Sequence, residues 1–299
     1  MDQLAKSLAE ANEQFITPGH AACGGCTAVL ALRHILEVMG KNTALVLPAS
    51  CTSVYVGGGE RTSIKIPCTT AAFETGGATA AGLRAGFLAQ GLDHVQVLSF
   101  VGDGGTYDIG LQSLSAAAER NDDIIYVCYD NEAYMNTGVQ RSSATPQGCW
   151  TTTTPLSLTK KETKKNIVEI MAAHRIPYIA TATVGFLDDL RQKVERAKGI
   201  CGMRFLHVLT PCVTGWRMPS SKAIKVSRLA VETGVFPLLE IIDGLHWKLT
   251  CAPDRLKPLN EYTSLQGRFR HLDDHAIAEM ESRVRAEYER ILNLTHTPK

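Results

Sequence analysis

Short apolar runs alternate with amphipathic segments along roughly the first 212 residues of this 299-residue chain. The apolar runs are rich in valine, isoleucine and leucine and stop at glycine, proline, aspartate or asparagine, as buried strands do. The segments between them repeat apolar residues at helical spacing. We predict strands at 43–50, 95–101, 123–131, 178–184 and 204–212, and helices at 70–91, 109–120, 163–176 and 186–199.

This repetition of strand, helix and strand predicts an α/β fold with a doubly wound, mostly parallel sheet. After Cys212 the pattern loosens into an irregular tail that ends in a helix. One face of that helix is apolar and carries Ile277, Met280, Val284 and Ile291. We expect a cofactor-binding domain over residues 1–215 and a C-terminal extension over 216–299 that packs on the core or on partner subunits.

Composition and charge exclude several classes of protein. Hydrophobic residues make up 44% of the chain and charged residues 20%, and the net charge is +1, so bulk electrostatics does not favour binding to nucleic acid or to a membrane surface. No apolar run reaches the ~18 residues that suggest a transmembrane helix. The N-terminal stretch is polar and helix-like and lacks the apolar centre of a signal peptide. We expect a cytoplasmic protein.

The segment after the second predicted strand places Asp103 among three glycines, Gly102, Gly104 and Gly105. A plain turn needs one or two glycines, so this loop leaves backbone N–H groups free for an anion. The carboxylate would repel that anion unless a cation bridged them. Asn131 leaves the next strand, and neighbouring strands are ~4.8 Å apart, so both side chains can offer oxygen to one Mg²⁺ ion. The pattern indicates a Mg²⁺–diphosphate site, and the absence of GxxxxGK[ST] disfavours a nucleotide.

Nine cysteines at irregular spacing do not indicate a disulfide framework. Cys23 and Cys26 form a CxxC motif, and Cys51 and Cys212 each follow a predicted strand, so the four thiols can gather at one edge of the sheet. Four thiolates suit either Zn²⁺ or a [4Fe–4S] cluster, and spacing cannot separate the two. His20 is either a further ligand or a packing residue. The other cysteines are interpreted as structural, with Cys128 a buried thiol: Cys68, Cys128, Cys149, Cys201 and Cys251.

Several segments together resemble the β subunit of pyruvate:ferredoxin oxidoreductase and its 2-oxoacid relatives. The resemblance runs from about Gly19 to Leu272, and "YDNEAYMNTG" is its most distinctive part. In the thiamine-diphosphate motif of this family, GDG opens a strand–helix–strand unit that closes on an asparagine. The matching segments are 102–120, 126–146, 150–155, 172–182 and 265–272.

The resemblance implies a role for each matching residue. The side chains of Asp103 and Asn131 and the backbone carbonyl of Ala133 would hold Mg²⁺. Asn136 would lie against thiamine diphosphate as a catalytic residue in contact with the substrate-derived adduct. The other cofactor contacts would be Gly102, Gly104, Gly105 and Thr52, and the [4Fe–4S] ligands would be Cys23, Cys26, Cys51 and Cys212.

The activity implied is oxidative decarboxylation of a 2-oxo acid, with electrons passing through the cluster to ferredoxin and the acyl group to coenzyme A where one is formed. Thiamine activation needs a glutamate against the pyrimidine ring, which in this family comes from another chain. We therefore expect a hetero-oligomer whose partner subunits carry the pyrimidine-binding half-site and ferredoxin-like clusters.

Alternatives remain at two levels. Pyruvate is the first candidate substrate, but the stretch "GCTAV" after Cys23 and the segment 55–79 depart from the pyruvate enzymes, which leaves oxalate or a branched-chain 2-oxo acid open. A non-redox thiamine decarboxylase or synthase would leave the four cysteines holding zinc or nothing. A non-catalytic iron–sulfur carrier or metal-stabilised binding module would leave the Mg²⁺–diphosphate residues unexplained.

Overall fold

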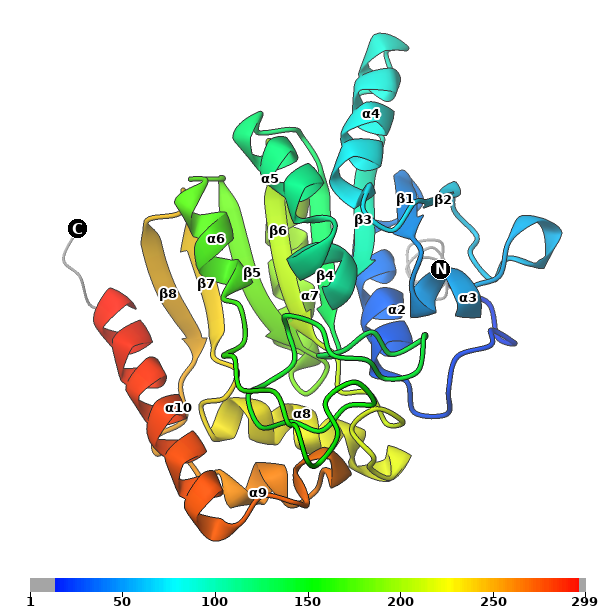
Figure 1. Cartoon of the computed structure of the whole chain (residues 1–299). Coiled ribbons are helices and arrows are strands. Elements are labelled where there is room, and N and C mark those ends of the chain that lie inside the picture. Colours follow the sequence, from blue (N-terminus) through cyan, green and yellow to red (C-terminus); the bar gives the residue numbers. More distant parts are fainter. Residues whose placement is uncertain (1–13, 296–299) are drawn as a thin grey trace, which may run out of the picture.

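The computed structural model describes residues 14–295, which form one eight-stranded sheet flanked by helices (Figure 1). The predicted N-terminal helix-like stretch falls on residues 1–13, outside the described part. In chain order the elements are α2 (Thr27–Met39), β1 (Thr43–Pro48), α3 (Cys51–Tyr55), η1 (Gly59–Arg61), β2 (Cys68–Ala71), α4 (Gly76–Ala89), β3 (Gln96–Gly102), η2 (Gly104–Asp108), α5 (Leu111–Glu119), β4 (Ile125–Asp130), α6 (Ile167–Ala173), β5 (Tyr178–Thr183), α7 (Leu187–Lys198), β6 (Arg204–Leu209), η3 (Ser220–Lys222), α8 (Ala223–Glu232), β7 (Leu238–Ile242), β8 (His246–Cys251), α9 (Asn260–Thr263), η4 (Gly267–Phe269) and α10 (Asp274–Thr295).

The strand order is β2-β1-β3-β4-β6-β5-β7-β8, and the first six strands are parallel. Alternate side chains of each central strand enter opposite faces, as the two-residue period of a strand requires. Leu98 and Phe100 of β3 pack with α2 and α7, whereas Val97 and Val101 pack with α4, α5 and α6. Both faces are therefore covered, and the predicted doubly wound α/β class is confirmed.

Four consecutive strands bring the predicted chemistry to one edge of the sheet. In the order β1, β3, β4, β6, each strand is hydrogen-bonded to the next, and Cys51, Asp103, Asn131 and Cys212 follow their carboxyl ends. The long connection 131–166 and helix α8 lie at this same end of the molecule (Figure 1). The position agrees with the general placement of ligands beyond the carboxyl ends of parallel strands.

Two expectations about secondary structure were wrong. Residues 68–71 are strand β2 at the sheet edge, where a helix was expected to begin at residue 70, and helix α4 starts only at Gly76. The tail after Cys212 was expected to be irregular before its final helix, but it contains the antiparallel strands β7 and β8. Both errors have the same physical reason. These strands are only four to six residues long and are stabilised by pairing, β2 with β1, β7 with β5 and β8 with β7, and local periodicity does not reveal such pairing.

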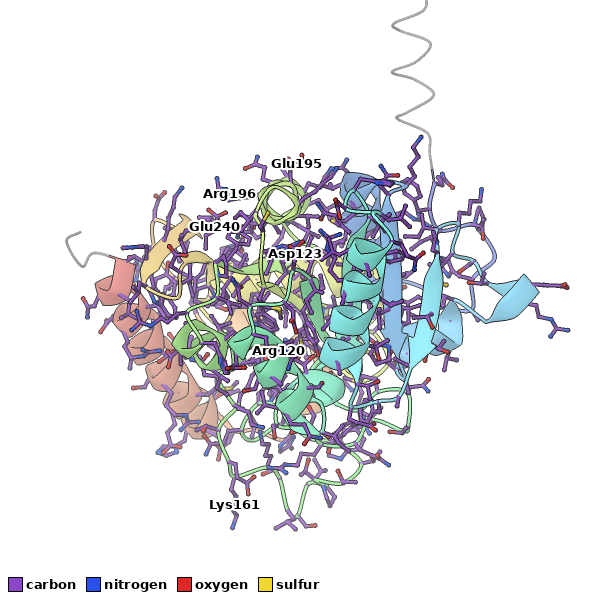
Figure 2. The ribbon with its side chains drawn as sticks, turned by 90° about the horizontal axis from the view of Figure 1, so that it is seen from above. Arg120, Asp123, Lys161, Glu195, Arg196 and Glu240 are labelled. Atoms are coloured by element: carbon purple, nitrogen blue, oxygen red, sulfur yellow. The ribbon has the colours of Figure 1, made fainter. Side chains whose placement is uncertain are left out.

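The expected C-terminal extension is joined to the rest by the sheet and by charge. Strand β7 pairs with β5, and Glu240 of β7 forms an ion pair with Arg196 of α7, which Figure 2 shows on neighbouring elements. Lys161 lies apart from them at the outer rim of the molecule (Figure 2). Among residues 14–295, no helix combines the length and the apolar character needed to cross a bilayer.

Candidate active site

A cavity of about 490 Å³ opens beyond the carboxyl ends of β1, β3 and β4. This volume is within the range of sites for small organic ligands and cofactors. Of the residues predicted to contact a cofactor or Mg²⁺, six line it: Gly102, Asp103, Gly104, Asn131, Ala133 and Asn136. The other lining residues are Ala49, Ser50, Cys51, Phe73, Tyr129, Tyr134, Met135, Thr137 and Gln140.

The Asn131 amide lies at ligand-like distances from two other oxygens of the cavity. One terminal atom of the Asn131 amide lies 2.8 Å from the Ala133 carbonyl oxygen and 2.9 Å from Asp103 Oδ1. With its nitrogen at that position, the amide donates to both oxygens. With its oxygen there, three oxygens face one another. Neighbouring oxygens in an octahedron with metal–oxygen distances of about 2.1 Å are about 3.0 Å apart, close to both distances, so the oxygen orientation suits Mg²⁺.

Asp103 is buried at 2% exposure, and Ser142 Oγ donates to its Oδ2 at 2.5 Å. Burial, and next the nearby Asp130, raise the pKa of Asp103 well above its usual range. Among the described residues, no lysine, arginine or histidine forms an ion pair with Asp103. A buried carboxylate without a cationic partner is costly, and a bound divalent ion would remove that cost.

The loop after Asp103 begins a helical run in which η2 leads into α5, and the first turn of a helix leaves its N–H groups without intrahelical partners. Glycine at position 104 is required by packing, because a Cβ there would collide with the ring of Tyr134. The Tyr134 hydroxyl donates to Asp108 Oδ2 at 2.5 Å. The packing of Tyr134 therefore explains why this position is a glycine, and the expectation that the Gly104 N–H faces a phosphate stays a prediction.

Two of the predicted cofactor residues lie beside the cavity rather than on its wall. Thr52 is fully buried, and its hydroxyl donates to the Tyr55 hydroxyl at 3.1 Å. Gly105 is also buried, and a Cβ there would be 2.9 Å from the side chain of Val101. Each of the two directly follows a wall residue in the sequence, Thr52 after Cys51 and Gly105 after Gly104. Their assignment as cofactor residues stays a prediction.

The four cysteines predicted to bind a cluster surround the same edge of the sheet. Burial, and next the neighbouring thiols of Cys212, Cys26 and Cys23, together raise the pKa of Cys51 to about 12. The same mutual effect appears at Cys212 and Cys26, where burial again dominates. All nine cysteines are unpaired, and no three His, Cys, Asp or Glu side chains among residues 14–295 converge tightly enough to share a single metal ion.

Backbone amides face two of these sulfurs. The Gly215 N–H donates to Cys212 Sγ at 3.3 Å. Cys26 immediately precedes α2, and the amides of Ala28 and Val29 at the start of that helix lower its thiol pKa against the larger effect of burial. Hydrogen bonds to ligating sulfur are one means by which proteins set the potential of iron–sulfur clusters. His20 Nδ1 accepts a hydrogen bond from the Ala22 N–H at 3.4 Å, and its role as a ligand or as a packing residue stays open.

Sequence reasoning missed a buried network directly behind Asn131. Asp130 Oδ2 accepts from the Tyr107 hydroxyl at 2.9 Å and from Lys164 Nζ at 2.6 Å, and it lies 2.8 Å from His207 Nε2. Burial acts to raise the pKa of Asp130, but Lys164 and His207 hold it well below its usual range. Burial lowers the pKa of His207. The only signal in the sequence was the aspartate that precedes Asn131.

A second cavity of about 730 Å³ lies on the far side of Glu132, between α6 and α10. The main charged groups on its wall are paired with one another: Lys164 binds Glu132, and Arg290 binds Glu169 and Glu287. None of the residues predicted to bind a cofactor or a metal lines it.

Comparison with known proteins assigns the family. A model of the thiamine pyrophosphate enzyme family, for the C-terminal TPP-binding domain, matches residues 54–208. The pyruvate synthase subunit PorB of Methanothermobacter marburgensis is 46% identical over 275 residues, which cover 91% of this chain and 95% of that protein. The ketoisovalerate oxidoreductase subunit VorB of Pyrococcus furiosus is 42% identical over 302 aligned positions, covering 98% of this chain and 97% of that protein.

A solved structure agrees in fold. The 2-oxoglutarate:ferredoxin oxidoreductase from Magnetococcus marinus matches with a TM-score of 0.59 at 18% identity, covering 73% of this chain and 81% of that chain. The chain therefore belongs to the thiamine pyrophosphate enzymes and, among them, to the 2-oxoacid oxidoreductase subunits that include PorB and VorB. The resemblance inferred from the sequence is confirmed.

Proposed function

We propose that this chain is the thiamine-diphosphate-binding subunit of a 2-oxoacid:ferredoxin oxidoreductase, with pyruvate as substrate. The observation that carries the proposal is the Asn131 amide atom 2.8 Å from the Ala133 carbonyl oxygen and 2.9 Å from Asp103 Oδ1, distances typical of neighbouring Mg²⁺ ligands. Thiamine diphosphate, when bound, supplies the carbanion stabilisation that decarboxylation of a 2-oxo acid requires.

Different residues of this chain would contact Mg²⁺, the diphosphate and the substrate-derived part of the cofactor. Asp103, Asn131 and the Ala133 carbonyl would bind Mg²⁺, which is shared with phosphate oxygens in sites of this kind. The N–H groups of Gly104 and Gly105 would face the diphosphate at the start of the helical run. Asn136 is exposed on the cavity wall, so its amide would meet the substrate-derived part of the adduct.

Cys23, Cys26, Cys51 and Cys212 would hold a [4Fe–4S] cluster, which accepts electrons one at a time when bound. Cys51 supports this placement in two ways. It lines the cavity, and the other three thiols are near enough to raise its pKa. Because Cys51 is both a wall residue of the cavity and a proposed cluster ligand, an electron would have only a short distance to travel from the cavity to the cluster. Ferredoxin would carry the electrons away, and the unpaired state of all nine cysteines suits a reducing, cytoplasmic location.

The cavity is one half of a site, and we propose that partner subunits supply the other half. None of its lining residues is a glutamate, although thiamine activation needs one against the pyrimidine ring. Val54 and Ile109 are exposed at 57% and 51%. Val54 lies on α3 and Ile109 directly follows η2, and each of these helices contributes a residue to the cavity wall. Exposed apolar side chains beside an incomplete site favour a covering partner. Coenzyme A would accept the acyl group in the assembled enzyme.

A branched-chain 2-oxo acid is the second candidate substrate. The ketoisovalerate oxidoreductase subunit matches a larger share of this chain than the pyruvate synthase subunit does, at only slightly lower identity. A turnover assay of the assembled complex with pyruvate and with 2-oxoisovalerate at equal concentrations separates the two by the ratio of kcat/KM.

The isolated chain tests the half-site proposal. After reconstitution with iron, sulfide, Mg²⁺ and thiamine diphosphate, we expect it to turn over no 2-oxo acid, because it lacks the activating glutamate. The same preparation mixed with its co-produced partner subunits should reduce ferredoxin. Turnover by the isolated chain would show that its own residues complete the site, and the proposal of a shared site would be wrong.

A further inference from the structure

Three side chains outside the cavity join the two turns that carry the proposed metal ligands. Glu132, Trp216 and Arg268, here named the Trp216 bracket, are all almost fully buried, at 3%, 0% and 1% exposure. They come from the connection after β4, from the turn after Cys212 and from η4. Neither the sequence pattern nor the family comparison assigns them a role.

The indole of Trp216 holds the backbone of the turn at Asn131. Its Nε1–H donates to the Asn131 carbonyl oxygen at 2.7 Å. The same residue belongs to the turn of Cys212, because the Trp216 N–H donates to the Cys212 carbonyl at 2.9 Å. Trp216 is therefore bonded directly to the segments of a proposed Mg²⁺ ligand and of a proposed cluster ligand.

Arg268 closes the bracket on the other side. Its guanidinium lies 3.6 Å from the centre of the Trp216 ring, and it forms an ion pair with Glu132 at 2.7 Å. Gln266 Oε1 accepts from Arg268 Nε at 2.9 Å, which fixes the plane of the guanidinium. A planar group stacked on an aromatic ring and paired with a carboxylate is well ordered.

Glu132 shows why the turn needs such support. Its backbone has φ of 68°, a conformation that non-glycine residues seldom adopt and that surrounding contacts must stabilise. This residue lies between Asn131 and Ala133, so its backbone conformation sets how the Asn131 amide and the Ala133 carbonyl are placed relative to each other. The ion pairs with Arg268 and Lys164 hold its side chain on the opposite side, against the second cavity.

We propose that the Trp216 bracket positions the divalent-cation site: Trp216, Glu132 and Arg268 fix the Asn131–Ala133 turn relative to the Cys212 turn. The inference rests on the proposed function, since it takes Asn131 and Ala133 as Mg²⁺ ligands. These are positioning residues that touch neither cation nor substrate. Groups that orient metal ligands from behind typically change metal affinity by about 10- to 100-fold when altered.

The test is a titration of the assembled complex, purified anaerobically, with Mn²⁺ in the presence of saturating thiamine diphosphate, followed by electron paramagnetic resonance. In Trp216→Phe the ring is kept under Arg268 but the donor to Asn131 is lost. We expect the Mn²⁺ dissociation constant to rise about 10- to 100-fold with the iron content unchanged.

Trp150→Phe is the matched control, because Trp150 also lies under an arginine, with Arg217 3.2 Å from its ring centre, but has no bond to Asn131. Equal Mn²⁺ affinity in the two variants would overturn the inference, as would a loss of iron in Trp216→Phe without a change in Mn²⁺ affinity. If Trp216→Phe does not assemble, Arg268→Lys decides: a several-fold rise in the dissociation constant supports the bracket, and wild-type affinity overturns it. Absence of Mn²⁺ binding in the wild type would instead overturn the proposed function itself.

Discussion

Thiamine diphosphate should dissociate from the Asp103→Ala variant at Mg²⁺ concentrations that retain it on the wild-type complex, with an affinity loss of at least about 100-fold. Asp103 supplies the only formal negative charge among the three oxygens proposed to bind Mg²⁺. Without that charge, the diphosphate meets backbone dipoles alone. The measurement is thiamine diphosphate retained after gel filtration at a series of Mg²⁺ concentrations, with iron assayed on the same fractions and expected to stay at the wild-type level.

The thermal stability of the Asp103→Ala variant distinguishes a role of Asp103 in cofactor binding from a role in holding the fold together. Because Asp103 is buried without a cationic partner, its removal should not lower the thermal stability of the cofactor-free complex. Asp108→Asn is the matched control: this aspartate ends η2 and pairs with the Tyr134 hydroxyl instead of Asn131, so thiamine diphosphate should be retained. A variant at Asp103 that keeps its cofactor would refute the ligand assignment.

Replacing Cys212 by serine should remove or degrade one cluster, with a loss of up to about four iron atoms per chain and a matching fall in visible absorbance. Serine offers a hydroxyl where the cluster requires a thiolate, and the Gly215 N–H that now faces the sulfur would face oxygen. Iron and acid-labile sulfide are measured on the anaerobically purified complex.

Cys251→Ser controls for the general effect of losing a partly buried thiol. Cys251 ends β8, which is three strands away from β6, the strand that precedes Cys212, and its replacement should leave iron at the wild-type level. Normal iron content in Cys212→Ser would exclude Cys212 as a ligand and would favour a non-redox thiamine enzyme.

The parallel strands at the centre of the sheet could be predicted because each of them is an apolar run in the sequence. The run that ends at Gly102 and the run that ends at Asp130 are adjacent parallel strands, as expected, and Gly102 pairs with Tyr129. Strand β2 and the hairpin of β7 and β8 could not be predicted, because β2 is stabilised by pairing with β1 and the hairpin by the pairing of β7 with β5, and such pairing leaves no local pattern.

The residues of the candidate site likewise fall into those that the sequence predicted and those that it did not. Residues whose type and local sequence context indicate a chemical role, such as Asp103 among its glycines, were predicted from the sequence, and most of the predicted cofactor and Mg²⁺ residues line one cavity. Residues that hold them in place were missed. Ser142, which donates to Asp103, and Trp216, which donates to Asn131, lie 39 and 85 positions from those partners. Tertiary packing alone brings such residues together, and no local pattern reports it.

The most direct test of the central claim is an anaerobic purification of this chain with its co-purifying subunits, followed by assay of iron, acid-labile sulfide, zinc and thiamine diphosphate. The account predicts iron, sulfide and thiamine diphosphate together, with partner chains present. Zinc in place of iron in an otherwise intact preparation would contradict the electron-transfer role and would identify a thiamine enzyme without redox function.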